Sequence, residues 1–201
     1  MTNFNKITKP TKINTKNNMK KIFAVAFAAI LTFTIMSCEQ QKVLNRSIKY
    51  ENGERILTGE FERSALLKKD YVGWYQPEFD SYEVEKSKLK SLKGLRNYRL
   101  QVFVGTWCSD SHRELPRLYK ILDDIKFPQN RLKVYAVNRD KKSFYGEELG
   151  KEITHVPTII VYDNNGTEMG RIVEAPVSGY LEEDLAQIVN GTPLTPNYSN
   201  D

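Results

Sequence analysis

The chain has 201 residues and a formal net charge of +5, a length that suits one globular domain with additional segments. Six of its 30 basic residues lie within residues 1–37, which contain no acidic residue, so 24 basic and 25 acidic residues remain from Cys38 onward. This nearly neutral body gives no support to nucleic-acid binding, and no nucleic-acid partner is expected.

The first 37 residues are expected to be a secretory signal that starts at Met1 or at Met19. Met19-Lys20-Lys21 forms a short basic segment, and the run from 22 to 36 is apolar apart from two threonines. Ser37 supplies a small residue at the cleavage position. A run of this length is too short for an ordinary membrane span, which needs about 20 apolar residues.

Ile35-Met36-Ser37-Cys38 resembles the lipobox of bacterial lipoproteins, in which the cysteine is lipid-modified and becomes the first residue of the mature chain. The resemblance implies a protein held by a lipid on Cys38 to a bacterial membrane and facing the periplasm. Residues 38–47 would then serve as a tether. The alternative is a plain signal peptide with an incidental cysteine.

Residues 48–80 are predicted to form a hairpin followed by an irregular segment. Asn52-Gly53 is a strong turn signal between apolar residues at 48–50 and at 56–57. The aromatic residues that follow show no clear period, so we expect them to pack on the main domain, where they could also cover a functional site. They are Tyr71, Trp74, Tyr75 and Phe79.

Residues 81–191 are predicted to form an α/β domain. Asp80 and Glu83 fit a capping box at the start of a first helix, and Val102-Phe103-Val104 is typical of a strand buried on both faces. This order of elements indicates a mixed sheet with helices on both faces. The later elements are expected as a helix from Cys108 through Ile125, a strand at 132–138, a short helix around 147–151, a strand at 158–162, a hairpin strand at 171–173, a helix at 181–189 and a tail at 192–201.

Trp107-Cys108-Ser109-Asp110-Ser111 lies where the first strand passes into the next helix. The motif resembles the thioredoxin superfamily, whose active site is Trp-Cys-x-x-Cys at such a junction. Glu114-Leu115-Pro116 matches the Glu-x-Pro of membrane-anchored thioredoxin-like proteins, and Val156-Pro157-Thr158 is similar to the family's cis-proline loop. The resemblance covers about residues 81–190 and implies a thioredoxin-like fold, here with an N-terminal hairpin extension.

Two residues depart from the family pattern. Ser111 stands where the resolving cysteine would be, and Val102 stands where thioredoxins carry a buried acidic residue, so the dithiol cycle is excluded. The resemblance implies that Cys108 is the reactive residue and that Ser111 can offer its hydroxyl to the sulfur. It further implies a substrate-binding wall made of Trp107, Val156 and Pro157.

A lone thiolate can attack a disulfide, but another thiol must then release it. The sequence therefore predicts monothiol thiol-disulfide exchange on extracytoplasmic proteins, with protein thiols or disulfides as partners and no cofactor. The alternative is a redox-inactive binding or scaffold module on the same fold. His112 and His155 could join Cys108 around a metal ion, but an exposed His112 and a loop-shaping role for His155 are the simpler interpretation, so no metal is expected.

Overall fold

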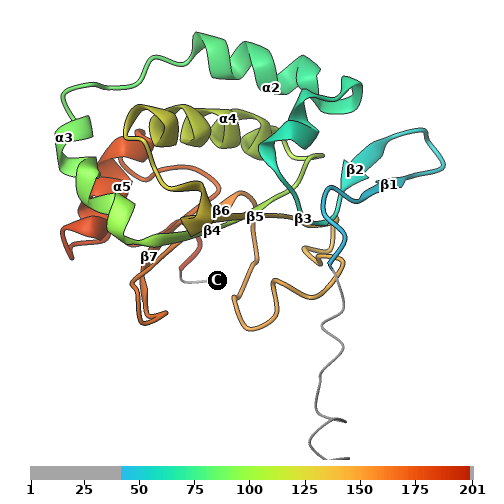
Figure 1. Ribbon diagram of the computed structural model, residues 1–201. Helices are drawn as coiled ribbons and strands as arrows, with labels where there is room; N and C mark the ends of the chain where they lie inside the picture. Colours follow the sequence, from blue (N-terminus) through green and yellow to red (C-terminus); the bar gives the residue numbers. More distant parts are fainter. Residues whose placement is uncertain (1–41, 200–201) are drawn as a thin grey trace, which may run out of the picture. The chain divides into compact units, whose positions relative to one another are not determined.

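The computed structural model describes residues 42–199, and Figure 1 shows their arrangement. The predicted signal peptide, Cys38 and the first residues of the predicted tether lie outside this range. Within it, no helix combines the length and the apolar character needed to cross a bilayer.

The described chain contains strands, α-helices and short 3₁₀ turns. Short 3₁₀ turns lie at Arg63–Leu67, Lys93–Asn97 and Gln129–Arg131. The main elements are β1 (Ser47–Lys49), β2 (Arg55–Leu57), β3 (Gly59–Glu60), α2 (Lys69–Ser81), α3 (Leu89–Leu92), β4 (Arg99–Val104), α4 (Ser109–Asp124), β5 (Leu132–Ala136), β6 (Thr158–Tyr162), β7 (Glu168–Val173) and α5 (Leu181–Val189).

The central sheet has the order β3-β5-β4-β6-β7. β4 and β5 are parallel, with Val102 opposite Val134, and the other neighbouring pairs are antiparallel. The mixed sheet and the α/β class predicted from the sequence are thus confirmed. The predicted hairpin is confirmed as well: β1 pairs with β2, and Gly53 takes the positive φ of +87° that its turn requires.

Alternation along the strands gives the sheet two different faces. Leu100, Val102 and Val104 of β4 point into the larger core cluster, whereas Phe103 points into a smaller cluster on the other face. Every helical residue in the two clusters belongs to the larger one, and Figure 1 shows the helices above the sheet. The sequence predicted helices on both faces of the sheet, whereas the described helices cover one face.

The second face of the sheet is covered by the long connection between β5 and β6. The short helix expected around residues 147–151 is absent there, and the segment forms hydrogen-bonded turns instead. Gly146 and Gly150 both have positive φ values, of +76° and +70°, which interrupt a right-handed helix. The Ser143 hydroxyl also donates to Glu147 Oε2 at 2.6 Å, so side chains replace helical backbone bonds.

The segment expected to be irregular contains the α2 helix, so that prediction was wrong. Tyr71 and Tyr75 lie one turn apart and are both buried, and the rings of Tyr75 and Tyr119 of α4 meet edge to face at 6.3 Å. Asp80, predicted to open a helix, instead lies in the last turn of α2 and accepts a hydrogen bond from Gln76 Nε2 at 2.8 Å. The expected capping box is therefore absent.

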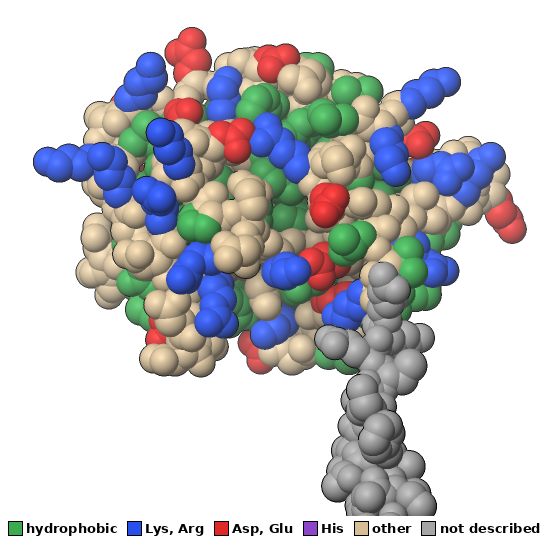
Figure 2. Space-filling model, viewed as in Figure 1, with side chains coloured by type: hydrophobic (Ala, Val, Ile, Leu, Met, Phe, Trp, Pro, Cys, Tyr) green, Lys and Arg blue, Asp and Glu red, His purple; other side chains and the backbone are tan. Residues whose placement is uncertain are grey.

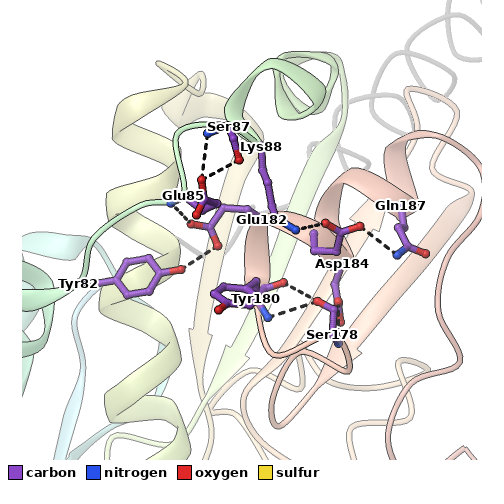
Figure 3. Close-up of polar contacts among 10 residues, drawn as sticks. Tyr82, Glu85, Ser87, Lys88, Ser178, Tyr180, Glu182, Asp184 and Gln187 are labelled. Carbon is purple, nitrogen blue, oxygen red and sulfur yellow. Dashed lines mark hydrogen bonds and ion pairs between the residues drawn. The ribbon is translucent and has the colours of Figure 1, made fainter.

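A buried carboxylate at the start of α5 fixes the connection between α2 and α3 (Figure 3). Glu182 is 0% exposed, accepts a hydrogen bond from Tyr82 Oη at 2.7 Å and accepts a second one from Glu85 N at 3.0 Å. Burial, followed by the hydrogen bond to Glu182, raises the pKa of Tyr82, so its hydroxyl stays protonated as a donor at neutral pH. Glu182 thereby joins two segments about a hundred residues apart.

Candidate active site

Cys108 caps the N-terminus of α4 immediately after the central strand β4. A turn brings it there, with Cys108 N donating to Gly105 O at 2.9 Å, and its carbonyl accepts the first helical bond from His112 N at 3.0 Å. The cysteine is half-buried, and within residues 42–199 it is the free cysteine of the chain. The sulfur thus lies at the strand-to-helix junction that the sequence predicted.

The sulfur faces the loop that precedes β6. Cys108 Sγ donates to Val156 O at 3.2 Å, and Asp110 Oδ2 lies 3.9 Å from the same sulfur. The Val156-Pro157 peptide bond is cis, as the resemblance implied, and both residues are buried. Residues 48 positions apart in sequence therefore form one site.

Trp107 covers the side of the site that adjoins β5. Its indole Nε1 donates to Val137 O at 2.9 Å, and the Arg139 guanidinium lies 5.0 Å from the centre of its ring. A Cβ atom at Gly105 would come within 2.6 Å of the indole, so a side chain there would displace the ring. The position before Thr106 therefore needs glycine because Trp107 packs back on the turn.

Ser111 is 1% exposed and stabilises the turn between Gly105 and Cys108. Its Oγ accepts a hydrogen bond from Gly105 N at 3.1 Å, which satisfies a buried backbone donor at the end of β4. The structure gives the sulfur of Cys108 its contacts with Val156 and Asp110, so donation from the Ser111 hydroxyl to that sulfur stays a prediction.

His112 is partly buried and contacts other residues of the site. The simpler interpretation of the sequence, an exposed His112, was therefore wrong. The imidazole ring stacks on Trp74 of α2 at 4.2 Å, and Nε2 lies 2.8 Å from Thr106 O, which requires the proton on Nε2. Thr106 Oγ1 in turn accepts a hydrogen bond from Leu57 N at 3.0 Å. The N-terminal extension thus supports the turn through α2 and β2.

His155 has different neighbours from His112. Its ring stacks on Tyr198 at 3.8 Å, and its Nδ1 lies 3.2 Å from Thr154 Oγ1. In the part of the chain that the structure describes, no group of three or more histidine, cysteine, aspartate or glutamate side chains is arranged to hold a metal ion.

Arg113 lies between two carboxylates next to the site. Its guanidinium contacts Asp110 Oδ1 at 2.9 Å and Glu114 Oε1 at 2.6 Å, so the acidic residue beside the sulfur has a cationic partner. Glu114 is 3% exposed, and burial raises the pKa of its carboxyl group although Arg113 opposes the shift. The sequence gave no sign of Arg113 except its helical spacing of three residues from Asp110.

A shallow groove of about 550 Å³ opens between α2 and the first turns of α4, and Ser109, the residue after Cys108, is part of its lining. Trp74 and Glu78 line its α2 side, and Ser109, His112 and Arg117 line its α4 side. From the sequence, Trp74 is expected to pack on the main domain, where it could also cover a functional site. The spacing of Tyr71 and Tyr75 was the signal that could have placed Trp74 on a helix.

Comparisons with known proteins give a family and a fold. A family model described as thioredoxin matches residues 67–180, more than half of the 201 residues. Two solved structures each give a TM-score of 0.50, with 66% of this chain and 93% of theirs covered: a protein of unknown function from Pseudomonas aeruginosa, 18% identical, and an HIV epitope scaffold, 21% identical. No curated protein matches. At these identities the two structures support the fold alone.

Proposed function

The chain belongs to the thioredoxin family, and from this premise we propose that it performs monothiol thiol-disulfide exchange through Cys108. The observation that carries the proposal is the position of the sulfur, at the N-terminus of α4 and 3.2 Å from the carbonyl oxygen of Val156. A half-buried thiol at this position is accessible to a disulfide bound along the cis-proline loop.

The reaction is an exchange of sulfur-sulfur bonds. The Cys108 thiolate attacks one sulfur of a substrate disulfide, so that bond breaks, a mixed disulfide forms, and the second substrate sulfur leaves as a thiolate that takes up a proton. A thiol from another molecule then attacks the mixed disulfide and releases Cys108. Ser111 has no sulfur to perform this second step within the protein.

Protein thiols or disulfides are the proposed partners. Trp107 would shield one side of the mixed disulfide, and the backbone at Val156 and Pro157 would form the opposite wall. The groove beside Trp74 and His112 would accept the substrate chain on the α2 side, because an indole ring and a partly buried imidazole offer both stacking and polar contact.

The protein should act while held to a bacterial membrane by a lipid on Cys38, with its folded part in the periplasm. This part of the proposal rests on the short apolar run that ends directly before Ser37-Cys38. Cys38→Ala is expected to block maturation or to release the protein from the membrane fraction. Mass spectrometry of the purified native protein tests it, and an unlipidated mature N-terminus at another residue would contradict the proposal.

Trapping of mixed disulfides in cells tests the exchange reaction. Acid quenching and alkylation of the full chain should yield adducts that vanish on reduction and that Cys108→Ala abolishes. Ser91→Ala, exposed on α3 and outside the groove beside Trp74, is the matched control and should retain them. An absence of Cys108-dependent adducts would favour a redox-inactive binding or scaffold module.

A further inference from the structure

A basic groove of about 520 Å³ opens on the second face of the sheet, at the starts of β4 and β5. Its lining includes four basic residues and no acidic residue. Tyr135 and Tyr162 form an aromatic part of the lining, and the basic residues are Arg99, Arg131, Lys133 and Lys151.

Three of these cations have no carboxylate partner in the described chain. Arg99 donates to Asn164 O at 3.0 Å, and Arg131 donates to Asn164 Oδ1 at 2.8 Å. The Lys151 ammonium lies 5.0 Å from the centre of the Tyr162 ring. Lys133 is the exception, because it pairs with Glu60. The groove thus contains three cations that form no ion pair with a described carboxylate.

The loop from 138 to 153 joins this groove to an exposed apolar surface. Ile153 packs against the second core cluster, and Lys151 lines the groove, so the loop lies on the second face. Leu149, two residues earlier, is 75% exposed, and Phe144 is 42% exposed. Figure 2 shows several Lys and Arg side chains over the lower half of the view, below the sheet of Figure 1.

The start of the described chain is held to the same loop. Val43 N donates to Tyr145 Oη at 3.1 Å, and Lys42 Nζ lies 3.6 Å from Glu147 Oε1. Val43 is itself 54% exposed. Lys42 lies only four positions after Cys38, and at about 3.5 Å per position this stretch spans no more than about 14 Å.

We propose that this second face, made of the basic groove and the 138–153 loop, docks on an anionic lipid bilayer. The inference rests on the proposed lipid anchor at Cys38, which would bring Lys42 and the attached loop to the membrane surface. Anionic headgroups attract unpaired lysine and arginine side chains, and exposed Leu149 and Phe144 can enter the boundary between headgroups and acyl chains. Because the stretch between Cys38 and Lys42 is short, an anionic bilayer is favoured over a soluble partner on this face.

Docking has a consequence for the thiol. Trp107 binds Val137 O and lies under Arg139, so the docked loop begins next to the candidate active site. Cys108 would be held near the bilayer surface, and its disulfide partners would be proteins that expose a disulfide at that level. The docked face therefore restricts the substrate class to membrane-proximal proteins.

A polarity-sensitive dye on Leu149→Cys tests the docking, in the mature lipidated protein that carries Cys108→Ser. The vesicles consist of phosphatidylcholine with about 30% phosphatidylglycerol, which gives a strongly negative surface. On binding to them, the dye fluorescence should rise at least about twofold, because the dye leaves water for the headgroup region. Raising the salt to about 0.5 M should reverse the rise, because screening weakens headgroup attraction. The same dye on Lys69→Cys, exposed on α2 on the helical side of the sheet, should not respond.

The triple variant Arg99→Glu, Arg131→Glu, Lys151→Glu should remove the rise while the protein still sediments with the vesicles. A circular dichroism spectrum equal to that of the parent would establish that it folds. If the parent protein sediments but the Leu149 dye stays in water, docking is wrong and the anchor stands. If the protein remains in the supernatant, both the anchor and the docking are wrong, whereas the exchange chemistry is judged separately by trapping.

Discussion

With dithiothreitol as the reductant, a Ser111→Cys variant is expected to reduce insulin faster than the natural protein. Its mixed disulfide is released within the molecule, whereas that of the natural protein must wait for a thiol from solution. Positions three apart at the start of a helix lie about 5 to 6 Å from one another, within the span of a disulfide. Ser111 lies one turn after Cys108 on the inner side of α4, so a sulfur there can attack the mixed disulfide. Turbidity from precipitated insulin measures the rate of reduction. We expect this rate to exceed that of the natural protein by more than about tenfold, because release of the mixed disulfide becomes intramolecular.

The structure also predicts what this variant loses. Ser111 Oγ accepts a hydrogen bond from buried Gly105 N, and sulfur is a weak acceptor, so the variant should be less stable by about 1–2 kcal/mol. Ser111→Ala should show the same loss without any gain in activity, and Cys108→Ala in the Ser111→Cys background should be inactive. Two slowly alkylated thiols with no insulin reduction would show that Cys108 is not reactive at this site.

Glu182→Ala is expected to lower the free energy of unfolding by about 2–4 kcal/mol, because it removes a buried carboxylate that accepts two partly buried hydrogen bonds. The two donors are Glu85 N and Tyr82 Oη, which Glu182 accepts at 3.0 Å and 2.7 Å. The carboxylate also lies in the first turn of α5, where negative charge is favourable. Urea unfolding followed by circular dichroism measures the change.

Two control variants separate the contributions of this network. Tyr82→Phe removes one donor and keeps the ring, so it should cost less, about 1 kcal/mol. Lys88→Ala removes the ion pair with the neighbouring Glu183, which is partly exposed, and should change stability little. An unfolding free energy of Glu182→Ala within about 0.5 kcal/mol of the parent would mean that water replaces the carboxylate and that the network is not structural.

Local pattern was enough for most elements of the domain. The apolar run at Val102-Phe103-Val104 and the spaced leucines of α4 and α5 correspond to observed elements because burial on two faces or on one stripe leaves a period in the sequence. The helix α2 was missed for a physical reason. Gly73 and Pro77 lower its intrinsic helix preference, and burial of Tyr71 together with packing of Tyr75 on Tyr119 of α4 overrides them.

In the candidate site, too, some features were predicted from the sequence and others were not. Cys108 and the cis Val156-Pro157 bond were expected from motifs, and the structure places the sulfur against Val156 O. The partners of His112 were not expected, because Trp74 and Thr106 reach it from other segments. No spacing rule links residues that meet only after α2 folds onto α4.

The sequence by itself determined the strands from β4 onward, the helices α4 and α5, the thiol at the start of α4 and the absence of a second cysteine beside it, since each is written in neighbouring residues. Only the tertiary structure decided where charge accumulates. The body of the chain is nearly neutral in composition, yet folding brings Arg99, Arg131 and Lys151 to one groove whose lining contains no acidic residue. Net charge is a sum over the chain, whereas a surface potential depends on which residues folding places side by side.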